Sequence, residues 1–595
     1  MCRPVTQSSR LLVAAKLLQM PRSRCRADQV AEAELDLLIE LASGKKTFDQ
    51  VRSDALKFAF AGEGLQRLVH SNASRGITQR LKQLTGIDKE SLSYFEVRCK
   101  EDCDGSKSRM HPFSLLSTRI QTIQAQDEEY FNIVREPVSN RNVVASSFTN
   151  SPEYLTHELV SSPVVDLAVV PVGLYSDGIK ICDDTHPDSL YVVYLYFLHR
   201  PADETARPLS KHLYTAYRKS DSSAETLEDI WKVLLWELKA LASGFLPLRG
   251  EERKPLASQC FGPLVTGRHC FCLMQVKGDW SWYVEALGLW QWNSKSHMCP
   301  YCRASRDGPL SWHNFSLEAP WLATCRDHSR YLEDMELSKR ADFCRDASPF
   351  AFEPLLCQAP FFKWTMVKLD WQHAQDLGAL SYEIGEAWWS LLPGLARLAT
   401  AGTKQDRGTG LQELKRRLKQ YYADKRVDSR IPLKRLGLRK IKARKHPKLK
   451  AKAVQTKRLL PFTLALAAEL RHTDGALGEH RYQSLGYASK ICSLASQREI
   501  TSDELMSWRA WQALHMFHYA SCGFRVYPKF HYALHLPAQV ERSGVPRTFW
   551  VYSDEGKNSE IRRVFNVCSK GHAVYQQILL RLDWLFALKA LRAAL

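Results

Sequence analysis

Residues 164–178 read VVDLAVVPVGLYSDG, an apolar run with many valines that ends at Asp177. Such a run is typical of a buried β-strand. Similar runs lie at 190–198, 270–276 and 364–369. Asp370 follows the last of these runs directly, and an amphipathic helical pattern covers 224–245. Strands separated by helices, with acids at two strand ends, predict an α/β fold.

After Asp370 the chain is almost wholly helical by pattern. Apolar residues recur at helical spacing over 376–400, 411–423, 460–470, 480–495 and 503–520. The expected organisation is therefore a helical N-terminal region (1–95), a linker (96–160), the first part of an α/β core (161–375), an all-helical insertion (376–540) and a return to the core with C-terminal helices (541–595).

A third acidic position lies in the late stretch 544–556, GVPRTFWVYSDEG, just before a helix predicted over 559–567. Glu555 is the expected acid there. The alternative third acid is Asp554, and lesser candidates are Asp183, Asp184 and Asp376. Taken singly, each is most simply a surface or capping acid. Together, Asp177, Asp370 and Glu555 could hold divalent metal, because hard cations such as Mg²⁺ and Mn²⁺ prefer carboxylate oxygens.

Four motifs, in one order along roughly 160–580, resemble motifs of the CACTA (En/Spm) DNA transposases. They are Ser176-Asp177-Gly178, Cys299-Pro300-Tyr301-Cys302, Leu369-Asp370-Trp371-Gln372-His373, and the His531–Leu536 segment with Trp550-Val551-Tyr552-Ser553-Asp554-Glu555 after it. The ordered set makes the resemblance specific. This sequence departs from the family pattern at Asp554, where the family has an aromatic residue, and at Gly556, where it has arginine.

The resemblance implies an RNase H-like catalytic core in which Asp177, Asp370 and Glu555 form a DDE triad. Two Mg²⁺ or Mn²⁺ ions about 3.5–4 Å apart would stabilise the attacking and leaving oxygens of a phosphodiester. His373 would contact the scissile phosphate or orient Asp370. The implied substrate is double-stranded DNA, both transposon ends and target. The implied assembly is a homodimer or a higher synaptic complex.

Cysteine spacing predicts a structural zinc site. Cys299-x-x-Cys302 is followed after 22 residues by Cys325-x-x-His328, which together offer four ligands for tetrahedral Zn²⁺. We expect a small zinc-knuckle module at about 290–330, with His297 and His313 as fallback ligands. The alternative is a CxxC pair without metal.

A basic run covers 434–458 without a single acid. Its expected DNA-contacting residues are Lys434, Arg435, Arg439, Lys440, Lys442, Arg444, Lys445, Lys448, Lys450 and Lys452. Each cation near a phosphate can release a counterion, so such a run gives salt-dependent affinity with little sequence preference. The alternative is that the run forms a solvated, flexible loop without a DNA partner.

The composition agrees with a nucleic-acid partner. The chain of 595 residues carries a formal net charge of +19, which favours a polyanion. No run of 18 apolar residues occurs, so no membrane-spanning helix is expected. Sixteen scattered cysteines favour a reducing compartment. The basic run predicts nuclear localisation. The acid-free, arginine-containing first 27 residues leave an organelle as the alternative.

The leading hypothesis is a DDE transposase that cleaves DNA strands at transposon ends and transfers them to a target. One rival is a catalytically inactive, transposase-derived protein that keeps the fold and binds DNA. The other is an unrelated zinc-containing interaction protein, which would leave the three acids far apart.

Overall fold

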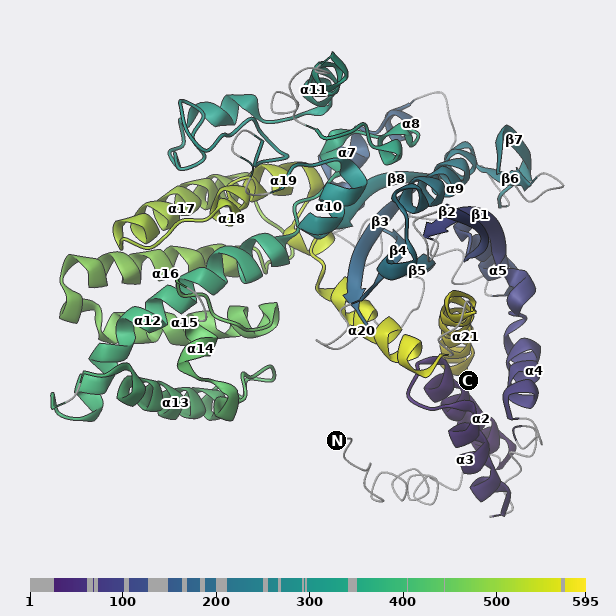
Figure 1. Cartoon of the computed structure of the whole chain (residues 1–595), viewed down its shortest axis with the longest axis horizontal. Coiled ribbons are helices and arrows are strands. Elements are labelled where there is room, and N and C mark those ends of the chain that lie inside the picture. The colour runs from purple at the N-terminus through teal and green to yellow at the C-terminus, as the bar shows by residue number, and fades with distance from the viewer. Residues whose placement is uncertain are drawn as a thin grey trace.

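The computed structural model shows a mixed α/β protein with a small mixed sheet (Figure 1). It describes residues 26–60, 68, 73–100, 106–126, 148–162, 168–181, 188–198, 211–249, 255–265, 269–291, 294, 297–340, 350–403, 405–442, 445–568 and 573–594. Asp183, Asp184, Arg444 and most of the basic N-terminal segment lie outside these ranges. Among the described helices, none is long and apolar enough to cross a membrane.

The central sheet has four strands in the order β5-β4-β3-β8. They are β3 (Ala168–Lys180), β4 (Ser189–Phe197), β5 (His212–Arg218) and β8 (His269–Gly278). The β3–β4 and β4–β5 pairs are antiparallel, and β3 and β8 are parallel. A single parallel bridge between Val276 and Val367 extends the order beyond β8. The acid-bearing strand β3 is therefore central, with neighbours on both sides.

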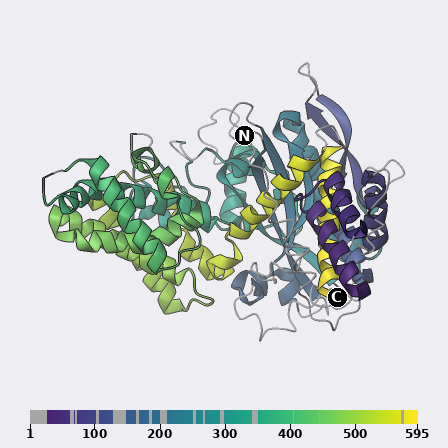
Figure 2. The same ribbon diagram turned by 90° about the horizontal axis from the view of Figure 1, so that it is seen from below.

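Both faces of this sheet are buried, which explains the continuous apolar runs in its strands. Val193 and Leu195 pack on one face against helix α9 (Ala224–Ser243). Val192 and Tyr194 pack on the other face. That second face is covered by α20 (Tyr552–Val567) and α21 (Val574–Ala594), and α2 (Arg26–Ala42) packs against α21. Figure 2 shows these first and last helices side by side, so the two ends of the chain share one layer.

Two elements of the core differ from the sequence prediction. The run 364–369 is not a regular strand: a 3₁₀ turn, η9 (Trp364–Met366), is followed by the lone bridge at Val367. Strand β5 was not predicted: polar and apolar residues do not alternate in its sequence, HLYTAYR. The helix predicted over 559–567 begins earlier, at Tyr552, so Glu555 lies inside its first turn.

Part of the segment predicted as a linker is folded. Strands β1 (Ser93–Lys100) and β2 (Ser106–Phe113) form an antiparallel hairpin, and α5 (Leu116–Gln126) follows it. Phe95 and Phe113 are buried against Trp236 of α9 and Tyr214 of β5 respectively. These aromatic contacts attach the hairpin to the sheet. The remaining described elements of the N-terminal half are α3 (Phe48–Phe60), α4 (Ala73–Thr85), α7 (Pro152–Leu155), α8 (Glu158–Ser161), β6 (Phe245–Arg249), β7 (Pro255–Pro263), α10 (Trp280–Leu287) and α11 (His328–Arg340).

A helical region with its own core lies beside the sheet in Figures 1 and 2. It contains η10 (Gln372–Ala379), α12 (Leu380–Ala399), α13 (Arg407–Asp424), α14 (Leu438–Ile441), α15 (Ala453–Glu469), α16 (Ala476–Leu494), α17 (Ser502–Ser521), α18 (Pro528–Ala533) and α19 (Leu536–Ser543). Its buried residues form one hydrophobic cluster, which also takes in Cys299, Cys302 and Trp321 from the segment before α11. The helical region is thereby packed onto the segment that carries the cysteine pair.

Candidate functional site

Three parts of the fold carry the predicted acids. Asp177 lies on β3, opposite Val192 of β4. Asp370 follows the parallel bridge at Val367, at the entry to η10. Glu555 lies in the first turn of α20, which packs on β3. The acids thus approach one edge of the sheet from a strand, a loop and a helix.

Asp370 is held by four hydrogen bonds. Its carboxylate accepts from the backbone N–H groups of Gln372 (3.1 Å), His373 (2.8 Å) and Val551 (3.1 Å). It also contacts His373 Nδ1 at 2.6 Å. Because Val551 directly precedes α20, this carboxylate connects the start of η10 to the helix that carries Glu555. Asp370 is buried, and its geometry is fixed from both sides.

His373 is the common neighbour of the three predicted acids. Burial lowers the pKa of its imidazole, but the hydrogen bond and charge of Asp370, helped by the charge of Glu555, raise it above its ordinary value. The charge of His373 in turn acts against the raised pKa of Asp177. The structure therefore brings Asp177, Asp370, Glu555 and His373 within electrostatic reach of one another.

Asp279 belongs to the same cluster and was not predicted. It follows the last residue of β8 and caps α10, where its carboxylate accepts from the backbone N–H of Trp282 at 2.7 Å. Burial and the charge of Asp279 raise the pKa of Asp177 to about 6. The available signal was the strand-then-acid pattern that identified Asp177. The predicted strand stopped at 276, three residues short of Asp279.

Like charges and burial also act on Glu555. Burial and the charge of Asp370 raise its pKa, while His373 and Gln372 oppose this shift. Asp177 accepts hydrogen bonds from Tyr175 (2.7 Å) and from Asn558 of α20 (2.9 Å). The acids are therefore held close together against their mutual repulsion by the surrounding fold. Such a group stabilises bound cations.

Asp554, the alternative third acid, has a different role. It is fully buried and lies 2.6 Å from Lys211 Nζ and 3.1 Å from Lys277 Nζ. Burial would raise the pKa of its carboxyl, but the two lysines outweigh burial and lower it. Lys277 belongs to β8 and also donates to the carbonyl of Trp550. Asp554 therefore attaches α20 to the sheet beside Glu555.

Asp376, a lesser candidate, is also occupied. It accepts a short hydrogen bond from the hydroxyl of Tyr552, and burial raises the pKa of its carboxyl to about 7. It lies on η10, so this contact is a second link between η10 and the start of α20.

A second cluster lies at the junction of the core and the helical region. Cys299, Cys302, His531 and His535 are buried, and their ligand atoms all lie within 4.8 Å of one another. Sγ of Cys299 is 3.3 Å from Nε2 of His535, and Sγ of Cys302 is 3.3 Å from Nε2 of His531. Tetrahedral Zn²⁺ binds sulfur at about 2.3 Å and nitrogen at about 2.0–2.1 Å. These separations suit such a geometry, so the cluster could bind a structural zinc.

The environment of the two thiols fits a metal site. The backbone N–H groups of Tyr301 and Ala304 donate to the sulfurs of Cys299 and Cys302 at 3.4 Å. Burial opposes ionisation of the Cys299 thiol, but Cys302 and the two histidines outweigh it and lower its pKa well below the usual range. A thiolate of this kind is the form that coordinates metal.

The predicted ligands Cys325 and His328 do not complete this cluster. Nδ1 of His328 accepts from the backbone N–H of Trp364 at 3.3 Å, and Cys325 is exposed with its sulfur 3.9 Å from Nδ1 of His535. Between them, the buried Arg326 donates to the carbonyls of Cys299 and Cys302. The segment after the cysteine pair therefore supports the knuckle from outside. The fallback residues His297 and His313 are not members either.

The histidines that do complete the cluster come from α18 and its junction with α19. Their spacing, His531-x-x-x-His535, puts both side chains on one helical face. This spacing is a recognisable ligand signal. It was overlooked because a nearer CxxH candidate filled the expected pattern.

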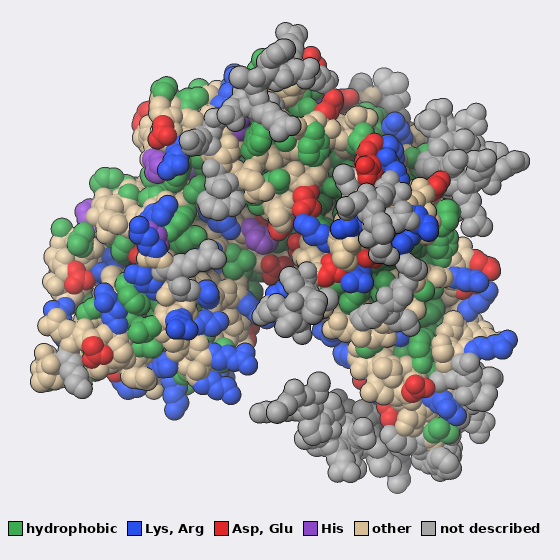
Figure 3. All heavy atoms as spheres, in the orientation of Figure 1, with side chains coloured by type: hydrophobic (Ala, Val, Ile, Leu, Met, Phe, Trp, Pro, Cys, Tyr) green, Lys and Arg blue, Asp and Glu red, His purple; other side chains and the backbone are tan. Residues whose placement is uncertain are grey.

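The basic run is packed rather than a solvated loop in its described part. Leu436, Ile441 and Leu449 are buried in the core of the helical region. Six of its predicted DNA-contacting residues are exposed: Lys434, Arg435, Arg439, Lys445, Lys450 and Lys452. Two others lie over aromatic rings, with Nζ of Lys442 4.8 Å from the Trp389 ring centroid and Nζ of Lys448 4.6 Å from that of Tyr382. Figure 3 shows Lys and Arg side chains gathered over this part of the molecule.

Comparison with known proteins adds no family: no protein-family model and no curated protein matches this chain.

Proposed function

We propose that this protein is a metal-dependent DNA strand-cleaving and strand-transferring enzyme of the DDE transposase type. The observation that carries the proposal is the grouping of Asp177, Asp370 and Glu555 around His373. These acids come from positions as far apart as 177 and 555, and ordinary surface acids would not be gathered in this way.

The sheet supports an RNase H-like core for this enzyme. Its three antiparallel strands β3, β4 and β5 are followed by helix α9 and by β8, which runs parallel to β3. The parallel bridge at Val367 stands where a fifth strand would join. Asp177 lies on the central strand β3, and Asp279 follows the neighbouring strand β8. Asp370 follows the bridge at Val367, and Glu555 lies on α20, which covers the sheet.

Asp177, Asp279, Asp370 and Glu555 would hold two Mg²⁺ or Mn²⁺ ions. The fit is supported by the raised pKa values of Asp177 and Glu555, since a site crowded with carboxylates gains from bound cations. Bound ions of this kind supply charge stabilisation for the attacking and leaving oxygens. Asp370 orients His373 through Nδ1, which leaves Nε2 of His373 to contact the scissile phosphate.

The helical region would bind DNA through the exposed cations of the basic run 434–458. The same basic run would direct the chain to the nucleus. A homodimer would present two acid clusters to a pair of DNA ends. The Cys299, Cys302, His531 and His535 cluster would hold a structural Zn²⁺, because protein ligands fill all four positions. This ion would fix the helical region onto the core.

The proposal is tested with purified protein, supercoiled plasmid and Mg²⁺. We expect nicked and linear products that form only when Mg²⁺ is added. Asp177→Asn and Glu555→Gln should each lower the rate by about 100-fold or more, because each removes several kcal/mol of charge stabilisation. Glu413→Gln is the matched control, since Glu413 pairs with Arg416 and Arg417 on α13.

Equal cleavage by wild type and by Asp177→Asn would contradict the proposal. Tight DNA binding without cleavage by the zinc-loaded wild type would instead support the alternative, an inactive transposase-derived DNA-binding protein. The departures at Asp554 and Gly556 favour that alternative, although the pairing of Asp554 with two lysines gives it a structural role.

A further inference from the structure

A layered group of side chains lies next to the acid cluster and is not used by the proposed chemistry. The rings of Tyr382 (α12) and Tyr527 are stacked, with centroids 4.0 Å apart and planes 20° apart. Nζ of Lys448 lies 4.6 Å from the Tyr382 centroid, and the guanidinium carbon of Arg525 lies 5.3 Å from that of Tyr527. We call these four residues the tyrosine–cation stack.

The stack is held in place by backbone contacts. The N–H of Leu449 donates to the carbonyl of Ser381 at 2.8 Å, which fixes the residue after Lys448 to the start of α12. One turn later, a Cβ on Gly385 would come within 2.7 Å of Leu449 N and 2.8 Å of Lys448 Cα. Only a glycine allows the basic run to approach α12 so closely. The position of Lys448 is therefore determined by the fold.

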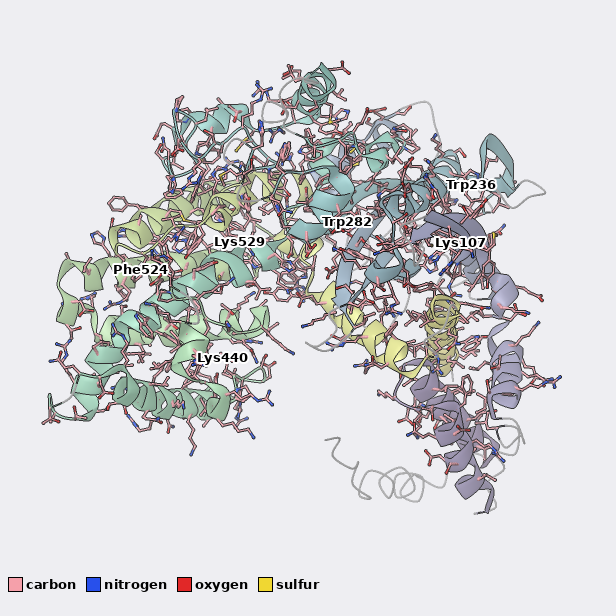
Figure 4. The ribbon with its side chains drawn as sticks, in the orientation of Figure 1. Lys107, Trp236, Trp282, Lys440, Phe524 and Lys529 are labelled. Carbon is pink, nitrogen blue, oxygen red and sulfur yellow. The ribbon has the colours of Figure 1, made fainter. Side chains whose placement is uncertain are left out.

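The stack is connected to the acid cluster through Lys529. This residue follows Tyr527 by two positions, and its Nζ donates to the carbonyl of His373 at 3.2 Å. Figure 4 shows Lys529 in the helical region, where it belongs to α18. The short segment from Tyr527 to Lys529 therefore joins the stack to the acid cluster.

The surroundings of the stack are mainly cationic. His446 packs edge-on against Tyr527, and the charges of Arg525, Lys445 and Lys442 act on its imidazole. The nearby acid, Glu386, is buried, and burial raises its pKa to about 7. It is therefore only about half ionised at neutral pH and offsets only part of this positive charge.

From this geometry we propose that the tyrosine–cation stack, with Lys529, binds the phosphodiester backbone of the DNA strand that enters the acid cluster. A cation held over an aromatic ring has less freedom to lose when it meets a phosphate. Arg525, with its planar fork of donors, suits a phosphate oxygen pair. The inference rests on the proposed function for its substrate class, and it assigns a strand path that the exposed cations of the basic run do not define.

The test measures binding of a fluorescent 20-base-pair duplex in buffer without chelator and without added Mg²⁺ or Mn²⁺, over a series of salt concentrations. Each phosphate contact contributes about 0.9 to the slope of log affinity against log salt. We expect Lys448→Met and Arg525→Met each to lower the slope by about 1. Lys107→Met, on the β1–β2 hairpin away from the helical region in Figure 4, should leave the slope unchanged.

The tyrosines separate a platform from a mere packing contact. Tyr527→Leu removes the ring under Arg525 and should weaken binding, while Tyr527→Phe keeps the ring and should bind as wild type does. If the ring and the cation act as a unit, the double variant with Tyr527→Leu and Arg525→Met should bind as weakly as the weaker-binding of the two single variants, and no more weakly. Thermal melting of each variant checks that it is folded.

Unchanged salt slopes in both cation variants, or an equal loss in Lys107→Met, would overturn the strand path. Since no Mg²⁺ or Mn²⁺ is added, the result is independent of cleavage. Loss of binding in Lys448→Met together with absent cleavage by wild type would leave the strand path standing and remove the catalytic proposal. Normal cleavage with unchanged slopes would do the reverse.

Discussion

His373 organises the acid cluster at the scale of single residues. Its imidazole contacts Asp370 and lies within electrostatic reach of Asp177 and Glu555, so one side chain interacts with acids from three parts of the chain. An imidazole with a raised pKa carries positive charge over a wider pH range. In this position it lowers the repulsion among the acids before any cation arrives.

Residue-level prediction depended on single acids that lie at the end of an apolar run or in a motif. Asp177, Asp370 and Glu555 were identified in this way and the structure brings them together, while their role as metal ligands stays a prediction. Asp279 was missed because the end of β8 was placed too early. No local pattern could show that Asp554 forms ion pairs with Lys277 of β8 and with Lys211, the residue before β5, since that pairing depends on the fold.

The Asp554 ion pairs should contribute strongly to stability. Asp554→Asn leaves Lys211 and Lys277 buried without a counter-charge, and we expect a loss of about 3–5 kcal/mol in the free energy of unfolding. Urea denaturation measures this change. The control is Asp428→Asn, whose exposed pairing with Arg458 should be worth less than about 1 kcal/mol. A similar small loss in both variants would contradict the docking role of Asp554.

At the scale of elements, the short helices α18 and α19 connect the two halves of the protein. They supply two histidines to the cysteine pair. In addition, the side chain of Gln539 on α19 accepts a hydrogen bond from the N–H of Leu369 at 2.8 Å and donates one to its carbonyl at 2.9 Å. The residue beside Asp370 and the Cys2His2 cluster are therefore held by the same pair of helices. A substitution that disrupts the Cys2His2 cluster should therefore also shift the position of Asp370.

Metal content should follow the ligand set in the structure. Wild type should retain about one equivalent of zinc after dialysis, and His535→Ala should lose it, because the substitution removes a ligand and leaves an open position. His328→Ala should keep the metal, since its imidazole bonds Trp364 instead. Elemental analysis of the dialysed proteins decides between them. Zinc lost from His328→Ala and kept in His535→Ala would restore the pairing predicted from spacing.

The sequence could reveal only the local half of this cluster. The Cys299-x-x-Cys302 knuckle is visible because its ligands are close together in the chain. Its partners lie more than 220 residues later, as the separation of 229 between Cys302 and His531 shows. Spacing rules favour near neighbours, whereas the distant pair is selected by how the helical region packs.

For the whole molecule, the mixed α/β class predicted from sequence is confirmed. The strongest apolar run, 190–198, corresponds to β4, Ser189–Phe197. The weaker strand prediction at 364–369 is wrong for a regular strand, since a 3₁₀ turn and one bridge occupy it. An RNase H-like core stays a prediction supported by strand order.

Global stability should fall in mild acid. Burial lowers the pKa of His111 to about 4 from an ordinary 6.5, so the folded state keeps this imidazole neutral while the unfolded chain protonates it. Its contribution is present above pH 6.5 and is lost as the pH falls toward 4. A shift of this size corresponds to about 3 kcal/mol.

His111→Gln isolates this contribution. Glutamine can keep a hydrogen bond to Thr215 and cannot titrate, so melting temperature should depend less steeply on pH between 6.5 and 4 than in wild type. Melting curves at several pH values measure this difference. Identical pH profiles for the two proteins would show that His111 is not responsible.

The separation of the zinc ligands also bears on the order of folding during synthesis. The cysteine pair leaves the ribosome more than 220 residues before the histidines that complete its cluster, and synthesis proceeds at about 5–20 residues per second. Closing so long a loop is slow unless the helices between have already formed. The cysteine pair and the two histidines can therefore meet only after most of the helical region has been synthesised, so a zinc ion bound by all four residues would be taken up late. A chain that ends before His531 would lack both histidines and would keep the thiols of Cys299 and Cys302 without their partners.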